Sequence, residues 1–121
     1  MAKTIQLLTA RCGKIRPDSV ADYLAHDGFS ALKKAMNMSP MEIINEVIDA
    51  KLLGRGGASY PAGKKWKQLY EIEGDPKYIV CNADEGEPGT FKDKVLLEKD
   101  PLSIIEGMAI AGYVFNSHEG Y

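Results

Sequence analysis

The sequence predicts an α/β fold, with an N-terminal helical segment followed by the first part of an α/β domain. Apolar residues recur at helical spacing in several segments, and residues 77–82 (KYIVCN) have the β-branched and aromatic content of a strand. Segments rich in glycine and proline separate them. The order helix, glycine loop, helix, strand, acidic loop, helix is typical of α/β architecture. We expect two parts, an arm with short helices over 1–50 and the α/β part over 51–121.

Composition excludes several classes of protein. The 121 residues are 45% hydrophobic and 26% charged, which is globular rather than disordered. A net charge of -2 gives no basic excess for nucleic acid. Two cysteines are too few for a disulfide framework, a four-ligand zinc site or an iron–sulfur cluster within this chain. No apolar run approaches the roughly 18–20 residues of a membrane helix, and the run over residues 5–10 is shorter than the apolar region of a signal peptide. We therefore expect a cytoplasmic protein without direct membrane insertion.

The first half predicts an irregular arm and three helices. The arm extends to Arg16, a short helix starts at Pro17 and ends near Gly28, and a second occupies residues 29–36. The clearest start is at residues 39–42 (SPME), a capping box with proline at the first helical position.

The second half predicts helices around one strand. A helix resumes near Ala62, the strand follows a turn at residues 74–76, and another helix spans 91–99. Asp100 and Pro101 cap a final helix that runs to about residue 116. This helix is apolar nearly all round, so we expect burial on several sides. Cys81, in the strand, is expected to be an inert core residue.

The segment LLGRGGASYPAGKKW, residues 52–66, has the features of an anion-binding loop. Glycine lets a ligand approach backbone amides, and a helix N-terminus adds positive partial charge. Two common templates fail: the Rossmann pattern meets Ser59 instead of glycine, and the P-loop pattern meets Lys65 instead of serine or threonine. A flexible surface connection with solvated lysines is the alternative, although Tyr60 favours stacking against a planar ring.

The segment after the strand, residues 82–90 (NADEGEPGT), is acidic. Its amide and carboxylate groups can accept hydrogen bonds from nucleotide or flavin hydroxyl and ring N–H groups, but they would repel phosphates. No histidine is nearby and EF-hand spacing is absent, so we assign no metal. A solvated acidic turn is the alternative. His26 and His118 are isolated, and no catalytic residue is assigned.

Three stretches taken together, LLGRGGASYPAGKKW, KYIVCNADEGEPGTFKDKVLLEKDP and IIEGMAIAGYVF, resemble one family. It comprises the FMN-binding, NADH-oxidising flavoprotein subunit of respiratory complex I and its relatives in NAD-dependent hydrogenases and formate dehydrogenases. The resemblance runs from about Arg11 to Tyr121, and residues 11–36 are more similar to the hydrogenase-type, electron-bifurcating branch. It implies that residues 51–121 begin a Rossmann-like FMN-binding domain and that the chain is an N-terminal fragment. The remainder would carry the rest of the flavin domain, a β-grasp-like domain and a four-cysteine [4Fe-4S] cluster.

The resemblance also implies residue roles. Glycine-loop residues would lie against FMN and NAD(H), with Lys65 reaching cofactor oxygens. Asn82, Asp84 and Glu85 would contact FMN, and Glu87 would lie at the NADH pocket. The family usually has glycine where this chain has Ser59. The complete predicted set is Gly54, Arg55, Gly56, Gly57, Ala58, Ser59, Tyr60, Pro61, Ala62, Gly63, Lys65, Asn82, Asp84, Glu85 and Glu87.

The implied activity is hydride transfer between NAD(H) and FMN, with electrons passed on to iron–sulfur clusters. The implied partners are the remainder of the subunit, a small [2Fe-2S] subunit and a larger iron–sulfur subunit, in a cytoplasmic assembly peripheral to a membrane complex. Two alternatives remain open. The chain is a non-catalytic fragment, or it is a nucleotide-binding module that does not bind flavin by itself.

Overall fold

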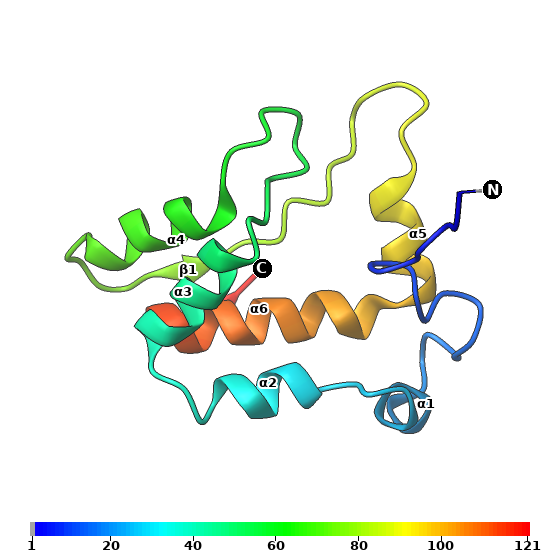
Figure 1. The fold of residues 1–121 in the computed structure, drawn as a ribbon, viewed down its shortest axis with the longest axis horizontal. Helices are drawn as coiled ribbons and strands as arrows, with labels where there is room; N and C mark the ends of the chain where they lie inside the picture. The colour runs from blue at the N-terminus through cyan, green and yellow to red at the C-terminus, as the bar shows by residue number, and fades with distance from the viewer. Residues whose placement is uncertain (1) are drawn as a thin grey trace.

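The computed structural model describes residues 2–121, and its longest helix, α6, lies at the centre of the molecule (Figure 1). Shorter helices and two minimal strands surround it. The elements are α1 (Val20–Ala25), α2 (Ser30–Ala35), α3 (Pro40–Asp49), α4 (Ala62–Glu71), β1 (Tyr78–Ile79), α5 (Lys92–Lys99), α6 (Pro101–Phe115) and β2 (Glu119–Gly120).

The core forms where α2, α3 and α4 pack against the C-terminal half of α6. Trp66 of α4 packs edge-on against Phe115, with ring centroids 5.4 Å apart. The fully packed members of the core are Ala35, Ile43, Ile44, Ala111, Val114 and Phe115. The core draws on both sides of residue 50, and the division into 1–50 and 51–121 stays a prediction.

The capping box predicted at the start of α3 is confirmed. Ser39 Oγ accepts a hydrogen bond from the Glu42 backbone N–H at 3.3 Å, and the Glu42 carboxylate accepts one from the Ser39 N–H at 2.6 Å. These bonds favour the ionised carboxylate, so they lower the pKa of Glu42. Two N–H groups that the helix cannot satisfy internally are thereby paired.

A close contact at Gly63 joins α4 to α3. A Cβ atom at Gly63 would lie 2.6 Å from Ile48 Cγ1 and 2.7 Å from the Ile48 backbone nitrogen. Only glycine lets the two helices approach this closely. The contact fixes the direction in which α4 leaves the loop that precedes it.

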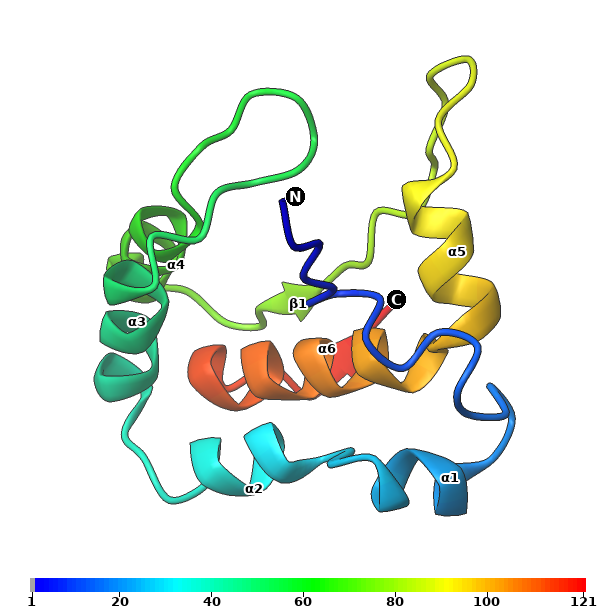
Figure 2. The same ribbon diagram turned by 45° about the vertical axis from the view of Figure 1, so that its right-hand side comes forward.

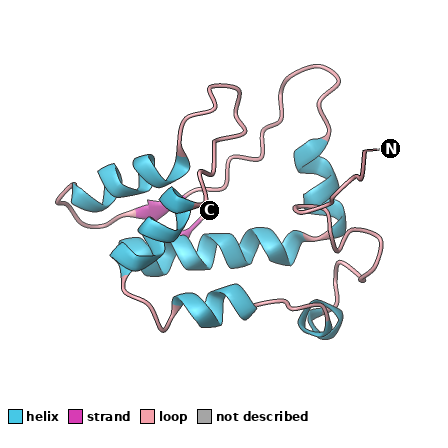
Figure 3. Ribbon diagram, in the orientation of Figure 1, coloured by secondary structure: helices cyan, strands magenta, loops and turns pink. Residues whose placement is uncertain are grey.

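The two strands are parallel, with Tyr78 opposite Glu119 and Ile79 opposite Gly120, and they lie beside α6 (Figure 3). A crossover through α5 and α6 connects them, so the predicted α/β class is confirmed. The strand predicted over 77–82 is shorter than expected. Strand geometry needs a paired neighbour, and the paired ladder extends over only two residues of each strand, continued by a 2.7 Å hydrogen bond from Cys81 N–H to the carbonyl of Tyr121.

Three further expectations need correction, and a fourth is confirmed. Helix α1 begins at Val20 rather than at Pro17, because the Ser19 side chain caps it by accepting from Asp22 N–H at 3.1 Å. The Asp100 side chain makes no capping bond to α6. Helix α6 packs on several sides, as expected, against four helices and both strands, although Ile105 stays 53% exposed. Cys81 is half-buried rather than part of the core.

Candidate cofactor-binding site

Two loops rise from the same side of the molecule (Figure 2). The glycine loop, residues 53–61, joins α3 to α4, and the acidic loop, residues 82–91, joins β1 to α5. The glycine loop is closed at its base by hydrogen bonds from Gly54 N–H to Tyr60 O and from Ala62 N–H to Leu52 O, each 2.8 Å long. The tip of the loop therefore projects from the base and does not pack in the core.

A cavity of about 950 Å³ lies between these loops. This size falls in the upper part of the roughly 300–1,000 Å³ range of small-molecule and cofactor sites. Both loops and the start of α5 contribute to its walls. The lining residues are Arg55, Gly56, Gly57, Asn82, Asp84, Glu85, Gly86, Glu87, Pro88, Thr90, Lys92 and Asp93.

The wall formed by the glycine loop consists of the glycine backbone and one cationic side chain, Arg55. A Cβ atom added at Gly56 or Gly57 would meet no atom within 4 Å, so nothing in the described chain blocks an approaching ligand there. Gly57 has φ +101°, which side chains rarely adopt. Ser59 has φ 51°, also left-handed, which provides a physical reason for a glycine preference at this position. Arg55 supplies the positive charge of this wall.

The opposite wall is acidic and partly self-bonded. The Asn82 side-chain oxygen accepts from Asp84 N–H at 3.2 Å. Lys92 and Asp93 form an ion pair of 3.0 Å. The hydrogen bond to Asp93, with the negative charges of Glu85 and Glu87, raises the pKa of Lys92, so this lysine stays charged. Despite that cation, carboxylates dominate the wall.

The structure brings together only part of the predicted site. Arg55, Gly56, Gly57, Asn82, Asp84, Glu85 and Glu87 share the cavity, whereas Gly54, Ala58, Ser59, Tyr60, Pro61, Ala62, Gly63 and Lys65 do not line it. Gly63 is buried against Ile48. The Tyr60 hydroxyl donates a hydrogen bond to Gln68 Oε1 at 3.1 Å, and Lys64 Nζ lies 5.8 Å from the centroid of the Tyr60 ring. Their ligand contacts stay a prediction.

Sequence reasoning missed five residues of the cavity wall. Gly86, Pro88, Thr90, Lys92 and Asp93 follow the acidic motif directly and line the cavity. Their place in the sequence could have indicated this, because they lie between or just after the predicted acidic residues. A loop that turns back into a helix can face the opposite loop along its whole length.

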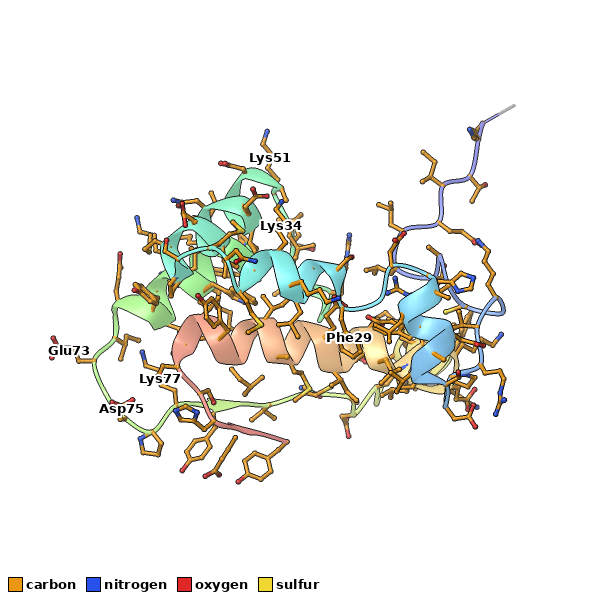
Figure 4. The ribbon with its side chains drawn as sticks, turned by 90° about the horizontal axis from the view of Figure 1, so that it is seen from below. Phe29, Lys34, Lys51, Glu73, Asp75 and Lys77 are labelled. Carbon is orange, nitrogen blue, oxygen red and sulfur yellow. The ribbon has the colours of Figure 1, made fainter. Side chains whose placement is uncertain are left out.

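A second polar cluster, on α6, was also missed. Glu106 is only 7% exposed, and its carboxylate accepts hydrogen bonds from the Tyr23 hydroxyl at 2.7 Å, Phe29 N–H at 3.0 Å and Leu32 N–H at 3.3 Å. Phe29, labelled beside α6 in Figure 4, stands at the start of α2 and packs edge-on against Tyr23. Burial and the hydrogen bond to Glu106 raise the pKa of Tyr23.

Asp100, in the same cluster, is 1% exposed and pairs with Arg11, whose Nε lies 3.0 Å from Oδ2. The Arg11 guanidinium also lies 4.7 Å from the centroid of the Tyr23 ring and donates to the carbonyl of His26. The pairing engages Oδ2 alone, and within residues 2–121 the buried Oδ1 has no hydrogen-bond partner. The cluster fastens residues 11–32 to α6 on the far side from the loops.

Two features are absent from the part of the chain that the structure describes. No helix within residues 2–121 is both long and apolar enough to cross a membrane. Nor do the described residues group three or more histidine, cysteine or acidic side chains in a way that could hold a metal ion.

Residues 47–121 match the family model of the Nuo51 FMN-binding domain. This match covers more than half of the chain, and the chain therefore belongs to that family. The match includes both loops, α4, α5, α6 and the two strands.

Longer relatives extend the similarity to nearly the whole chain. An NADH-quinone oxidoreductase subunit of Aquifex aeolicus is 49% identical over 98% of this chain and 28% of its own length. The HndC subunit of the NADP-reducing hydrogenase of Solidesulfovibrio fructosivorans is 44% identical over 98% of this chain and 24% of its own length. The chain thus spans about a quarter of the curated relatives it matches.

A solved structure shares the fold. A chain in the crystal structure of an NAD⁺-reducing [NiFe]-hydrogenase in the air-oxidized state superposes with a TM-score of 0.70 and 36% sequence identity. The similarity covers 87% of this chain and 19% of that chain.

Proposed function

We propose that this member of the FMN-binding family forms one part of an FMN site in an NADH:acceptor oxidoreductase, with the flavin held between the glycine loop and the acidic loop. One observation carries the proposal: these loops, separated in sequence by α4 and β1, line a single cavity of about 950 Å³. One wall offers backbone amides and a cation, and the other offers carboxylate and amide oxygens. These suit the phosphate and the hydrogen-bonding ring of FMN respectively.

The charges of the walls suggest how the ligand is oriented. A phosphate group is expected at the glycine wall, where backbone amides at Gly56 and Gly57 and the Arg55 guanidinium offer donors and positive charge. The ring and ribityl hydroxyl groups are expected toward Asn82 and Asp84, since carboxylate and amide oxygens accept hydrogen bonds. The reverse orientation would place phosphate against the carboxylates.

Bound FMN would supply the chemistry, accepting a hydride from NADH. The residues of this chain bind and orient, and none is assigned as a general acid or base. Following the family resemblance, we assign Glu87 to the NADH side of the cavity and Lys65 to dinucleotide oxygens. We also propose, from the same resemblance, that the other glycine-loop residues of the predicted set lie against FMN or NAD(H).

The activity of the whole protein is part of this proposal, because the relatives are about four times as long as the chain. We propose that electrons pass from the flavin to a [4Fe-4S] cluster in the rest of the subunit. From there they would reach a small [2Fe-2S] subunit and a larger iron–sulfur subunit. We also propose a cytoplasmic location and a boundary between an N-terminal part and the flavin-binding part near residue 50.

An FMN titration of the chain, followed by flavin fluorescence and absorbance, tests the proposal. Saturable binding that Gly57→Val weakens would support it, since a branched side chain at φ +101° strains the loop and intrudes on the cavity. Gly107→Val, on the open face of α6, is the matched control. Absence of FMN binding would contradict a flavin site that the two loops of this chain form by themselves, and saturable NADH binding without flavin would favour the nucleotide-binding module.

A further inference from the structure

We infer that Glu85 is a positioning residue, which anchors the acidic loop by capping α5 instead of acting through direct contact with the ligand. The expected effect on FMN binding rests on the proposed function, whereas the contacts between Glu85 and α5 do not depend on it. It revises the role that the family resemblance implies for this residue.

Both carboxylate oxygens of Glu85 are already engaged within the chain. Oε2 accepts a hydrogen bond from Asp93 N–H, and Oε1 accepts one from Lys94 N–H at 3.2 Å. These amides belong to the second and third residues of α5, which lack intrahelical acceptors. A negative charge at this end of a helix is also favoured by the helix dipole.

Helix α5 has no cap of its own. Phe91 occupies the N-cap position and makes no side-chain capping bond. Glu85, eight residues before Asp93, takes over the task that serine, threonine or aspartate performs at most helix starts. The bond therefore ties the middle of the acidic loop to the beginning of the following helix.

The backbone at Glu85 supports an anchoring role. Its φ of 45° lies in the left-handed region, which costs energy for any residue with a side chain. Such a conformation persists where the surroundings over-determine it, and here the two bonds to α5 provide that restraint.

The neighbouring carboxylates have a different status. Asp84 and Glu87 line the cavity, and within residues 2–121 neither side chain makes a hydrogen bond or an ion pair. The Glu85 carboxylate thus stabilises the conformation of the loop, whereas the carboxylates of Asp84 and Glu87 are available to a ligand. This difference predicts that Glu85 affects ligand binding indirectly, by restricting the motion of the acidic loop.

Amide exchange of the ligand-free chain tests the inference by NMR. Because a helix cap is worth a factor of roughly five in local stability, Glu85→Gln should speed exchange at Asp93 and Lys94 about fivefold. Glu98→Gln, near the other end of α5, is the matched control and should leave both amides unchanged. Unchanged exchange in Glu85→Gln would overturn the inference, whether or not the chain binds FMN.

Glu85→Asp gives a second arm that keeps the charge. The shorter side chain cannot span to both amides, so exchange should again rise, with far-UV circular dichroism confirming that the other helices remain folded. Weaker FMN binding in both variants together with faster exchange is the expected result. Weaker FMN binding with unchanged exchange would show direct contact and overturn the positioning role.

Discussion

Helices α2 and α5 begin in the same unusual way but in opposite surroundings. Each has a phenylalanine at its N-cap, Phe29 or Phe91, with no side-chain capping bond. Each has its first amides bound by a remote glutamate instead. Glu106 reaches α2 across 77 residues of sequence, whereas Glu85 reaches α5 across eight.

The difference lies in what else the carboxylates face. Glu106 is buried beside Tyr23, so its hydrogen bonds take the place of most contacts with water and hold two parts of the chain together. Glu85 lies at the wall of an open cavity, where its bonds shape a loop. The same contact thus stabilises the fold in one place and organises a candidate site in the other, and substitutions should separate these effects.

The largest effect is expected for Glu106→Ala. Removing the carboxylate leaves the Tyr23 hydroxyl and two backbone amides without an acceptor in a buried place, which should cost about 3–5 kcal/mol of unfolding free energy. Urea denaturation followed by circular dichroism measures the loss. Glu98→Ala, an exposed glutamate on α5, is the control, and equal losses in the two variants would contradict the buried role.

A smaller loss is expected for Gly63→Ala, which tests the packing beneath the glycine loop. The new Cβ would meet the Ile48 backbone, and separating α4 from α3 should cost about 1–3 kcal/mol. Gly107→Ala has open space around its Cβ and should instead stabilise α6 by about 0.5–1 kcal/mol. Thermal unfolding of the pair compares the two positions, and shifts of the same sign would refute the assigned contact.

Tyr23→Phe should cost about 1 kcal/mol at neutral pH through the lost bond to Glu106. It should also change the alkaline limb of the stability curve. Because the folded state raises the pKa of Tyr23 above its ordinary 10.0, the unfolded chain loses this proton first. Stability therefore falls as the pH rises above about 10. The phenylalanine variant should lose less stability than the parent over that range, and parallel curves would argue against Tyr23 as the source.

The smallest effect on stability is expected at the cavity. Arg55→Ala removes an exposed side chain, so unfolding free energy should change by less than about 0.5 kcal/mol. FMN affinity should nevertheless fall about tenfold, because the charge-assisted contact to phosphate is lost. Arg16→Ala, an exposed arginine far from the loops in sequence, serves as the control. Equal FMN affinity in both variants would remove Arg55 from the site.

Local features of this protein follow from neighbouring residues and were predictable. The capping box at Ser39 and Glu42, the glycine loop and the position of the strand all depend on residues a few places apart. Long motifs in a fixed order also identified the family, because backbone turns and helix starts need particular residues at particular spacing. The α/β class followed from the order of these elements.

Tertiary structure decided which of those residues meet. Gly63 packs against Ile48 instead of lining the cavity, and β1 is short because little of its length finds a partner. Most of all, the roles of Asp100, Glu106 and Glu85 come from partners that local patterns do not specify. A carboxylate has the same formula on a surface or in a core, and only the groups that the folded chain brings within hydrogen-bonding distance determine whether it holds the fold, shapes a loop or faces a ligand.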